Sequence, residues 1–110
     1  MRQRMRLLTG LVCTALLGFA CPALADAIDG DWCRADGKRM MIRGPAIVTP
    51  GGQQINGNYT RHSFSYVIPA GEAGAGATVS IQLLSEYLAH ARQGTDAPVQ
   101  EWRRCQPGIS

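Results

Sequence analysis

Turn-forming residues along positions 36–57 constrain the fold of this chain more than any other feature. Four turn signals follow one another there: Asp36-Gly37, Gly44-Pro45, Pro50-Gly51-Gly52 and Asn56-Gly57. Glycine and proline pairs of these kinds interrupt regular structure, and about 22 residues that hold four of them leave no room for a helix. The segments between the turns have the length of short strands. We therefore expect an all-β fold, with strands at 38–43, 46–49 and 53–55.

The run GNYTRHSFSYVIP, residues 57–69, is expected to form one long strand. It is rich in aromatic and branched residues, which favour strands, and side chains on a strand alternate between its two faces. The inward face would carry Phe64, Tyr66 and Ile68. His62 lies at the polar end of that face and should sit near a rim, whereas Arg61 should face water. Asn56-Gly57 is expected to open the strand as a hairpin turn.

Further strands are predicted at 32–33, 78–84, 87–92 and 99–105, with a turn at Ser85-Glu86. A short helix over 85–93 is the alternative, because Leu84, Tyr87, Leu88 and Ala91 also fit helical spacing. The short turns predict a small antiparallel barrel or rolled sheet of six to eight strands, mostly up-and-down in order. So small a barrel should be packed and leave no large ligand cavity. The residues expected to fill it are Met40, Ile42, Phe64, Tyr66, Ile68, Val79, Ile81 and Leu83.

The first 25 residues have the pattern of a secretory signal peptide. Arg2, Arg4 and Arg6 form a basic head, an apolar run extends from Leu7 to Cys21, and Ala23-Leu24-Ala25 provides an A-x-A cleavage site. Cleavage after Ala25 would leave one β domain at 26–110 in the periplasm or outside the cell. The lipoprotein alternative would acylate Cys21, but the bulky Phe19 suits a lipobox badly. The apolar run is also shorter than the roughly 20 residues that a membrane helix needs, so no integral membrane protein is expected after cleavage.

Removal of the signal peptide changes the charge of the chain. The full sequence has 11 lysines and arginines against 8 acidic residues. Three of the arginines and none of the acids lie in the signal, so eight basic residues face eight acidic ones in the mature chain. A net charge of zero removes the main electrostatic support for nucleic-acid binding. No nucleic-acid partner is predicted.

Cys33 and Cys105 are the two cysteines that remain after cleavage. An exported protein meets an oxidising compartment, so the two are expected to form one disulfide that joins the first and last strands. The competing interpretation is a metal or thiol-redox site. Neither cysteine belongs to a C-x-x-C pair, and neither histidine has ligand spacing to them. We predict no metal and no cofactor, and expect Trp32 and Trp102 to pack near the bridge.

The candidate binding surface predicted from the sequence consists of Tyr59, Arg61, His62 and the loop that carries Glu72. This glycine-rich loop, AGEAGAGA at 70–77, is interpreted as a mobile surface loop, because no G-K-[ST] follows it and Glu72 would repel a phosphate. Acid–base chemistry at His62 would require a carboxylate such as Glu86 or Glu101 beside it. No G-x-S-x-G motif supports a serine nucleophile. We therefore predict no catalytic residue.

The segments GDWC, TPGG, GNYTRHSFSYVIPAGEAGAG and EWRRC together resemble small exported proteins of Gram-negative, especially alphaproteobacterial, genomes. More loosely, the chain is similar to the periplasmic C-type lysozyme inhibitors. That resemblance implies a small β-barrel in which a disulfide can tie the first strand region to the last. The inhibitors carry an S-x-x-G-x-x-Y loop, which this sequence lacks; its nearest segment is Ser85-Glu86-Tyr87.

These observations lead to one expectation about function and two alternatives. The chain is expected to be a non-catalytic binding module of the cell envelope, with an envelope protein or a small ligand as its partner. The first alternative is an inhibitor of lysozyme or of another hydrolase. The second is a small periplasmic enzyme that uses His62.

Overall fold

The computed structural model describes residues 27–106. The predicted signal peptide, the cleavage site after Ala25 and the alternative acylation site at Cys21 lie outside the described residues. Among the residues that are described, no helix is long and apolar enough to cross a membrane.

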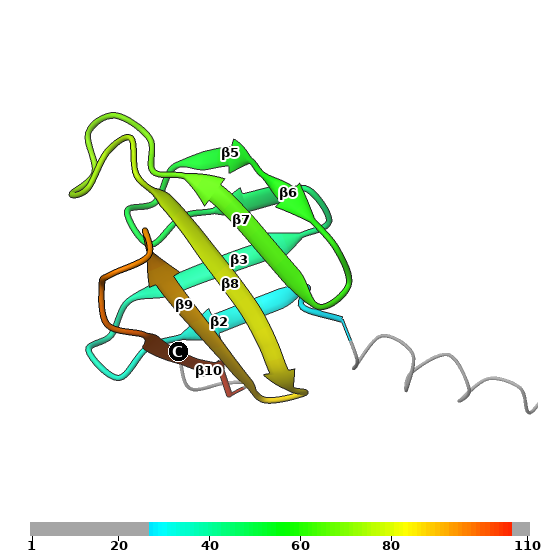
Figure 1. The fold of residues 1–110 in the computed structure, drawn as a ribbon. Coiled ribbons are helices and arrows are strands. Elements are labelled where there is room, and N and C mark those ends of the chain that lie inside the picture. Colours follow the sequence, from blue (N-terminus) through cyan, green and yellow to red (C-terminus); the bar gives the residue numbers. More distant parts are fainter. Residues whose placement is uncertain (1–26, 107–110) are drawn as a thin grey trace, which may run out of the picture.

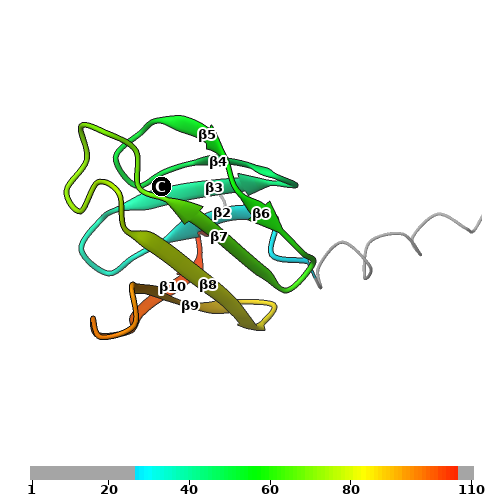
Figure 2. The same cartoon turned by 45° about the horizontal axis from the view of Figure 1, so that its top comes forward.

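Residues 27–106 fold into a single antiparallel sheet that rolls into a nearly closed barrel (Figures 1 and 2). Every neighbouring pair is consecutive in the chain except β2 and β10, the first and last strands described, which lie side by side. The predicted all-β class and up-and-down order are thus confirmed. The strands are β2 (Gly30–Cys33), β3 (Arg39–Arg43), β4 (Ala46–Val48), β5 (Gln54–Asn56), β6 (Asn58–Tyr59), β7 (Ser63–Val67), β8 (Thr78–Ser85), β9 (Leu88–Gln93) and β10 (Gln100–Arg104).

The described sheet has nine strands, so the expectation of six to eight was wrong. The extra strand arises because residues 57–69 form two strands, β6 and β7, instead of one. The Thr60 side chain causes the break: its hydroxyl accepts hydrogen bonds from the backbone N–H groups of His62 (3.2 Å) and Ser63 (2.9 Å). Threonine is a residue type that favours strands, but here the local hydrogen bonds of its hydroxyl stabilise a tight turn.

Asn56-Gly57 does not form the predicted hairpin. β5 pairs with β4 and β6 pairs with β7, and the chain passes from one to the other through Gly57 without pairing between them. The glycine is required by close packing. A Cβ at Gly57 would lie 2.3 Å from the carbonyl oxygen of Ser65 and 2.6 Å from the Phe64 ring. The absence of a side chain lets β5 and β6 meet as the two edges of the rolled sheet.

Residues 85–93 form a turn and a strand, so the helical alternative was wrong. β9 pairs with β8 on one side, where Ile81 faces Ala91, and with β10 on the other, where Trp102 faces Ala89. The pairing of β8 and β9 carries an irregularity between Leu83 and Ser85. A short helix is only marginally stable by itself, whereas the strand is paired with a neighbour on each side. This tertiary context outweighs the helical spacing.

The core matches most of the predicted interior. Six of the eight predicted residues are buried, whereas Val79 and Leu83 are partly buried and pack against the core. On β7, Phe64 and Tyr66 are buried while Val67 on the other face is exposed, so the predicted register of that strand is confirmed. The sequence interpretation missed buried residues outside its longest alternating segments: Ile28, Ile47, Ala89 and Ala91.

A disulfide joins Cys33 in β2 to Cys105 just after β10, as predicted. The two strands also pair directly, with Arg103 opposite Cys33. The backbone N–H of Cys105 donates to the carbonyl oxygen of Asp31 at 3.1 Å. The bridge therefore fastens the seam at which the first and last strands meet.

One end of the barrel, which we call the sealed end, is closed by residues 27–29 and Arg104. Ile28 is fully buried. The half-buried Arg104 guanidinium donates to the carbonyl oxygens of Ala27 (2.6 Å), Asp29 and Glu86 (2.7 Å). Its carbon Cζ lies 4.2 Å from the centre of the Trp32 ring. The start of the described chain is thereby locked into the barrel.

Candidate ligand pocket at the open end of the barrel

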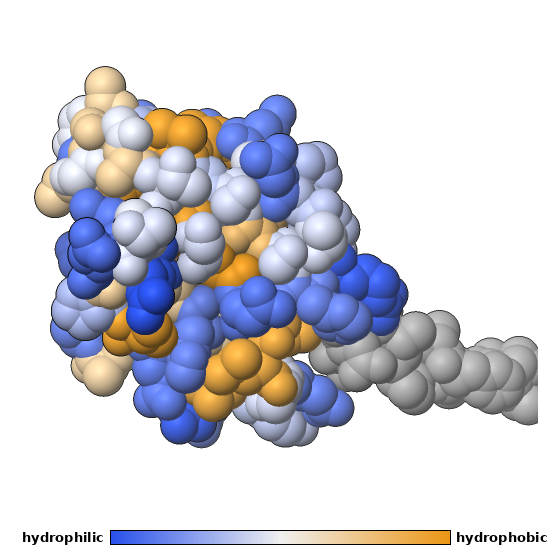
Figure 3. Space-filling view, viewed as in Figure 1, coloured by the Kyte–Doolittle hydropathy of each residue, from blue (hydrophilic) through white to orange (hydrophobic). Residues whose placement is uncertain are grey.

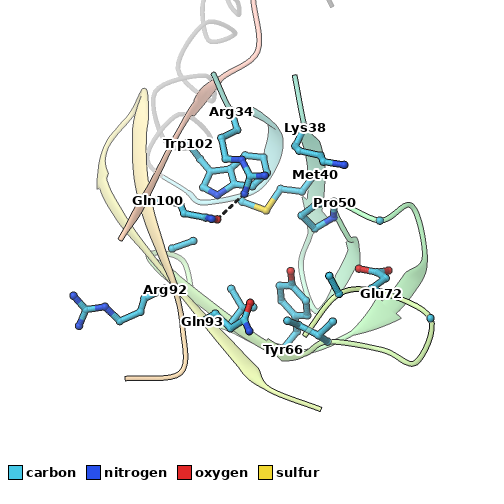
Figure 4. A pocket seen from close by; sticks show the side chains of 16 residues that line it. Arg34, Lys38, Met40, Pro50, Tyr66, Glu72, Arg92, Gln93, Gln100 and Trp102 are labelled. Carbon is cyan, nitrogen blue, oxygen red and sulfur yellow. Dashed lines mark hydrogen bonds between the residues drawn. The ribbon is translucent and has the colours of Figure 1, made fainter. Parts of the chain in front are cut away.

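The opposite end, which we call the open end, contains a hollow of about 390 Å³ (Figure 4). Its base is formed by core side chains, among them Met40, Ile68 and Ala91, and its rim by residues of the turns and loops at 34–38, 50–51 and 71–73. The interior was predicted to be packed and to leave no large cavity; the side chains at the base are buried, and the hollow is an open depression above them. Residues 27–29 fill only the sealed end, and no other segment within residues 27–106 closes the open end in the same way.

Trp102 of β10 stands in the wall of the hollow and is 2% exposed. Its indole N–H is buried and has no hydrogen-bond partner within residues 27–106. A buried donor without an acceptor costs about 1–3 kcal/mol, so native proteins rarely retain one. The nitrogen has less than 1 Å² of exposed surface, so an acceptor atom from outside the described chain would pair with it only after a covering side chain, such as Arg34, moves aside.

Arg34 covers the Trp102 ring, with its Cζ 5.1 Å from the ring centre. Three hydrogen bonds hold the guanidinium there: Nε and Nη2 donate to the Asp36 carboxylate at 2.9 and 2.8 Å, and Nη1 donates to Gln100 Oε1 at 2.6 Å. The hydrogen bonds from Arg34 lower the pKa of Asp36 to about 2. Both partners are therefore charged at neutral pH. Arg34, Gln100 and Trp102 thus form one fixed wall (Figure 4).

The sealed end provides an internal comparison for this wall. There Trp32 is likewise covered by an arginine, Arg104, but its indole N–H donates to the carbonyl oxygen of Ile28 at 2.9 Å. The two tryptophan–arginine pairs are alike except that only the sealed end supplies an acceptor. The unpaired donor is therefore a property of the open end and not of tryptophan burial in this barrel.

Glu72 stands on the other side of the hollow, on the glycine-rich loop. Its Oε2 accepts a hydrogen bond from the hydroxyl of the buried Thr49 at 2.6 Å. The carboxylate packs so tightly over Gly51 that a Cβ there would lie 2.3 Å from Glu72 Cδ. The loop itself is tied by backbone hydrogen bonds, including Ile68 N–H to Ala77 O at 2.9 Å. The loop that was predicted to be mobile is built of hydrogen-bonded turns. It places the Glu72 carboxylate beside the hollow.

Tyr66 of β7 lies between these two walls. Burial raises the pKa of Tyr66 to about 12; the Glu72 carboxylate adds to the rise, and the Arg34 guanidinium opposes it. The phenol therefore stays protonated at any physiological pH and can both donate and accept a hydrogen bond. Its ring is packed against Phe64, with centroids 6.5 Å apart, which fixes its orientation.

The structure divides the four predicted site residues between the two ends of the barrel. Glu72 lines the hollow. Tyr59, Arg61 and His62 lie at or next to the turn between β6 and β7, at the end of β7 away from the Glu72 loop (Figure 1). The Tyr59 hydroxyl donates to the Asp29 carboxylate, which also accepts from the Gly44 N–H at 2.7 Å. Burial raises the pKa of Asp29, but these hydrogen bonds outweigh it and hold the pKa below its ordinary value.

His62 is exposed and borders a shallow depression with Leu83, Leu84, Ser85 and Glu86. None of the carboxylates in the described residues lies within ion-pair distance of it. The orienting carboxylate that an acid–base histidine requires is thus not supplied by Glu86 or Glu101 in this arrangement. Over the same part of the chain, no group of three or more histidine, cysteine or acidic residues is placed to hold a metal ion.

Six polar residues of the hollow escaped the sequence interpretation as site residues: Arg34, Lys38, Tyr66, Arg92, Gln93 and Gln100. They come from separate segments that are adjacent only through strand pairing. One signal was present in the sequence: Arg34 follows the predicted first strand, and Gln100 is the second residue of the predicted last one. Pairing these two strands antiparallel brings both side chains to the same edge. Trp102 was predicted only to pack near the disulfide, and its N–H was not predicted to belong to a site.

No protein-family model, curated protein or solved structure matches this chain.

Proposed function

We propose that this chain is a non-catalytic binding module of the cell envelope that holds a small polar ligand in the hollow at its open end. The observation that carries the proposal is the buried Trp102 N–H without an acceptor in the wall of that hollow. The volume of about 390 Å³ lies at the lower end of the range for small-molecule sites. The expected placement in the envelope rests on the predicted signal peptide. The expected small-molecule partner rests on the concave shape and the size of the hollow.

The chemistry of the wall supports binding in preference to catalysis. The polar groups around the hollow are held by hydrogen bonds to one another: Arg34 to Asp36 and Gln100, and Glu72 to Thr49. Groups fixed in this way are preorganised for recognition, which lowers the entropic cost of binding. No nucleophile with an adjacent base is found among the residues that border the hollow.

A thermal-shift screen with a matched pair of variants tests the proposal. Ala73→Trp places an indole at the rim of the hollow from an exposed loop position, whereas Ala75→Trp adds the same side chain to the same loop outside the lining. A library of amino acids, short peptides, sugars and dicarboxylic acids is added to each protein. A ligand at a hundred times its Kd stabilises by about 2.7 kcal/mol, which corresponds to a rise in Tm of several degrees.

We expect at least one compound to raise the Tm of the wild-type protein and of Ala75→Trp, but not that of Ala73→Trp. Equal shifts in both variants would place binding elsewhere on the surface. A screen in which no compound moves the wild-type protein would remove the small-molecule function.

A protein partner, as in the inhibitor alternative, would use the sealed end instead. Leu84 and Tyr87 are 50% and 65% exposed there, at the end of β8 and in the turn that follows it. Figure 3 shows an apolar area at this end of β8. A partner bound there would be retained equally by wild-type protein and Ala73→Trp in a pull-down from envelope extract, which separates the two functions.

A further inference from the structure

The charges around the hollow are segregated by sign. Arg34 and Lys38 belong to the turn between β2 and β3, and Glu72 belongs to the loop between β7 and β8 (Figure 4). Asp36 neutralises Arg34 through two hydrogen bonds, while Lys38 has no ion pair among the described residues. The Arg34 side of the hollow therefore carries one uncompensated positive charge.

The Glu72 side carries one uncompensated negative charge. Glu72 is held by the neutral hydroxyl of Thr49 and forms no ion pair within residues 27–106. Lys38 and Arg92 also border the hollow, and in Figure 4 both side chains extend outward from it. A purely anionic ligand would be repelled by Glu72, a purely cationic one by Lys38, and a neutral one would satisfy neither charge.

The hydrogen-bonding groups follow the same division. On the Arg34 side, the Trp102 N–H needs an acceptor, and the described contacts of Arg34 use three of the five N–H donors of a guanidinium. A carboxylate is the strongest acceptor available to these donors. On the Glu72 side, Oε2 accepts from Thr49, which leaves lone pairs of the carboxylate for donors of a ligand. The neutral Tyr66 hydroxyl between them can serve either group.

We propose that the ligand is a small zwitterion, such as a free amino acid or a short unblocked peptide, with its carboxylate at Trp102 and Arg34 and its ammonium at Glu72. This inference rests on the proposed function and specifies its substrate class. The hollow of about 390 Å³ has room for an amino acid or a dipeptide.

The decisive experiment compares unblocked and blocked ligands on the wild-type protein. The probes are a mixture of L- and D-amino acids and dipeptides, the same mixture after N-acetylation, the same mixture after C-terminal amidation, and a set of neutral mono- and disaccharides. Thermal shift identifies the members that bind, and isothermal titration gives their Kd. We expect N-acetylation and amidation each to weaken binding at least tenfold, and the sugars to produce no shift.

Two charge variants assign the ends of the ligand. Glu72→Gln keeps an oxygen for the Thr49 hydroxyl and removes only the charge, so it should weaken the unblocked ligand about tenfold and leave the N-acetylated one unchanged. Lys38→Gln should weaken the unblocked ligand and leave the amidated one unchanged. The blocked-ligand comparison decides alone if a variant fails to fold, because it needs no substitution.

The outcomes separate this inference from the proposed function. Equal binding of blocked and unblocked compounds, or binding of sugars that Ala73→Trp abolishes, would overturn the zwitterion and leave the pocket standing. Absence of binding by any of the four sets, with no difference between Ala73→Trp and Ala75→Trp, would overturn both.

Discussion

Reduction of the Cys33–Cys105 disulfide is expected to lower the free energy of unfolding by roughly 4 kcal/mol, because the bridge closes a loop of 72 residues. Such a loop greatly restricts the unfolded chain, and a domain of this size has a small core to compensate for its loss. For a domain of this length, that change corresponds to a fall in Tm of more than about 15 °C. Urea unfolding of the oxidised protein and of the Cys33→Ser/Cys105→Ser double variant measures it.

The entropic origin of this effect can be tested separately. The oxidised and the double-variant proteins should differ mainly in their unfolded states, so the native hydrogen bond from Cys105 N–H to Asp31 O should still protect that amide from exchange. A free energy of unfolding that changes by less than about 1 kcal/mol would contradict the claim that the bridge holds the seam of the sheet.

Arg104→Ala is expected to destabilise the protein by about 3 kcal/mol, because it leaves three backbone carbonyls at the sealed end without their donors. It also removes the cation that lies over the Trp32 ring. The chain start at Ala27 and Asp29 loses its hydrogen bonds with Arg104 at the same time, and keeps those of Asp29 with Tyr59 and Gly44. Denaturant unfolding gives the loss of stability, and hydrogen exchange should show the largest loss of protection near residues 27–30.

Arg103→Ala is the matched control for this change. Its side chain lies next in the chain, is exposed, and forms only a surface ion pair with Glu101 at 3.3 Å. Such pairs contribute little in water, so a change within about 0.5 kcal/mol is expected. Similar losses for both arginines would show that the sealed end does not depend on the hydrogen bonds of Arg104.

The features of the fold that could be predicted from the sequence are those set by local patterns. Short strands are predicted by the turn pairs around Gly37 and Gly44, which separate them. Their buried face is predicted by the alternation from Phe64 to Ile68. The two errors were at Thr60 and Gly57. Threonine is a residue type that favours strands, but the Thr60 hydroxyl accepts hydrogen bonds from the backbone N–H groups of His62 and Ser63. Gly57 resembles a turn glycine, yet glycine is required there because a side chain would collide with the carbonyl oxygen of Ser65. Only the folded chain brings Ser65 near it.

The site was harder to predict than the fold. Of the four residues chosen from the sequence, Glu72 alone borders the hollow, because clustering along the chain favoured the neighbours Tyr59, Arg61 and His62. β7 runs from one end of the barrel to the other and separates these three from Glu72. The unpaired state of the Trp102 N–H depends on every surrounding side chain, and no sequence pattern reports it.

The most direct measurement of the central claim is the ¹H–¹⁵N spectrum of the two tryptophan indoles, since the sequence contains only Trp32 and Trp102. Loss of one signal in Trp102→Phe assigns the pair. The Trp32 N–H already donates to Ile28 O at 2.9 Å and serves as the internal control. On titration with the library compound that raises the Tm most, the Trp102 signal should move downfield as it gains an acceptor, while the Trp32 signal stays fixed. A bound compound that leaves the Trp102 signal in place, or moves only that of Trp32, would contradict a ligand site at the open end.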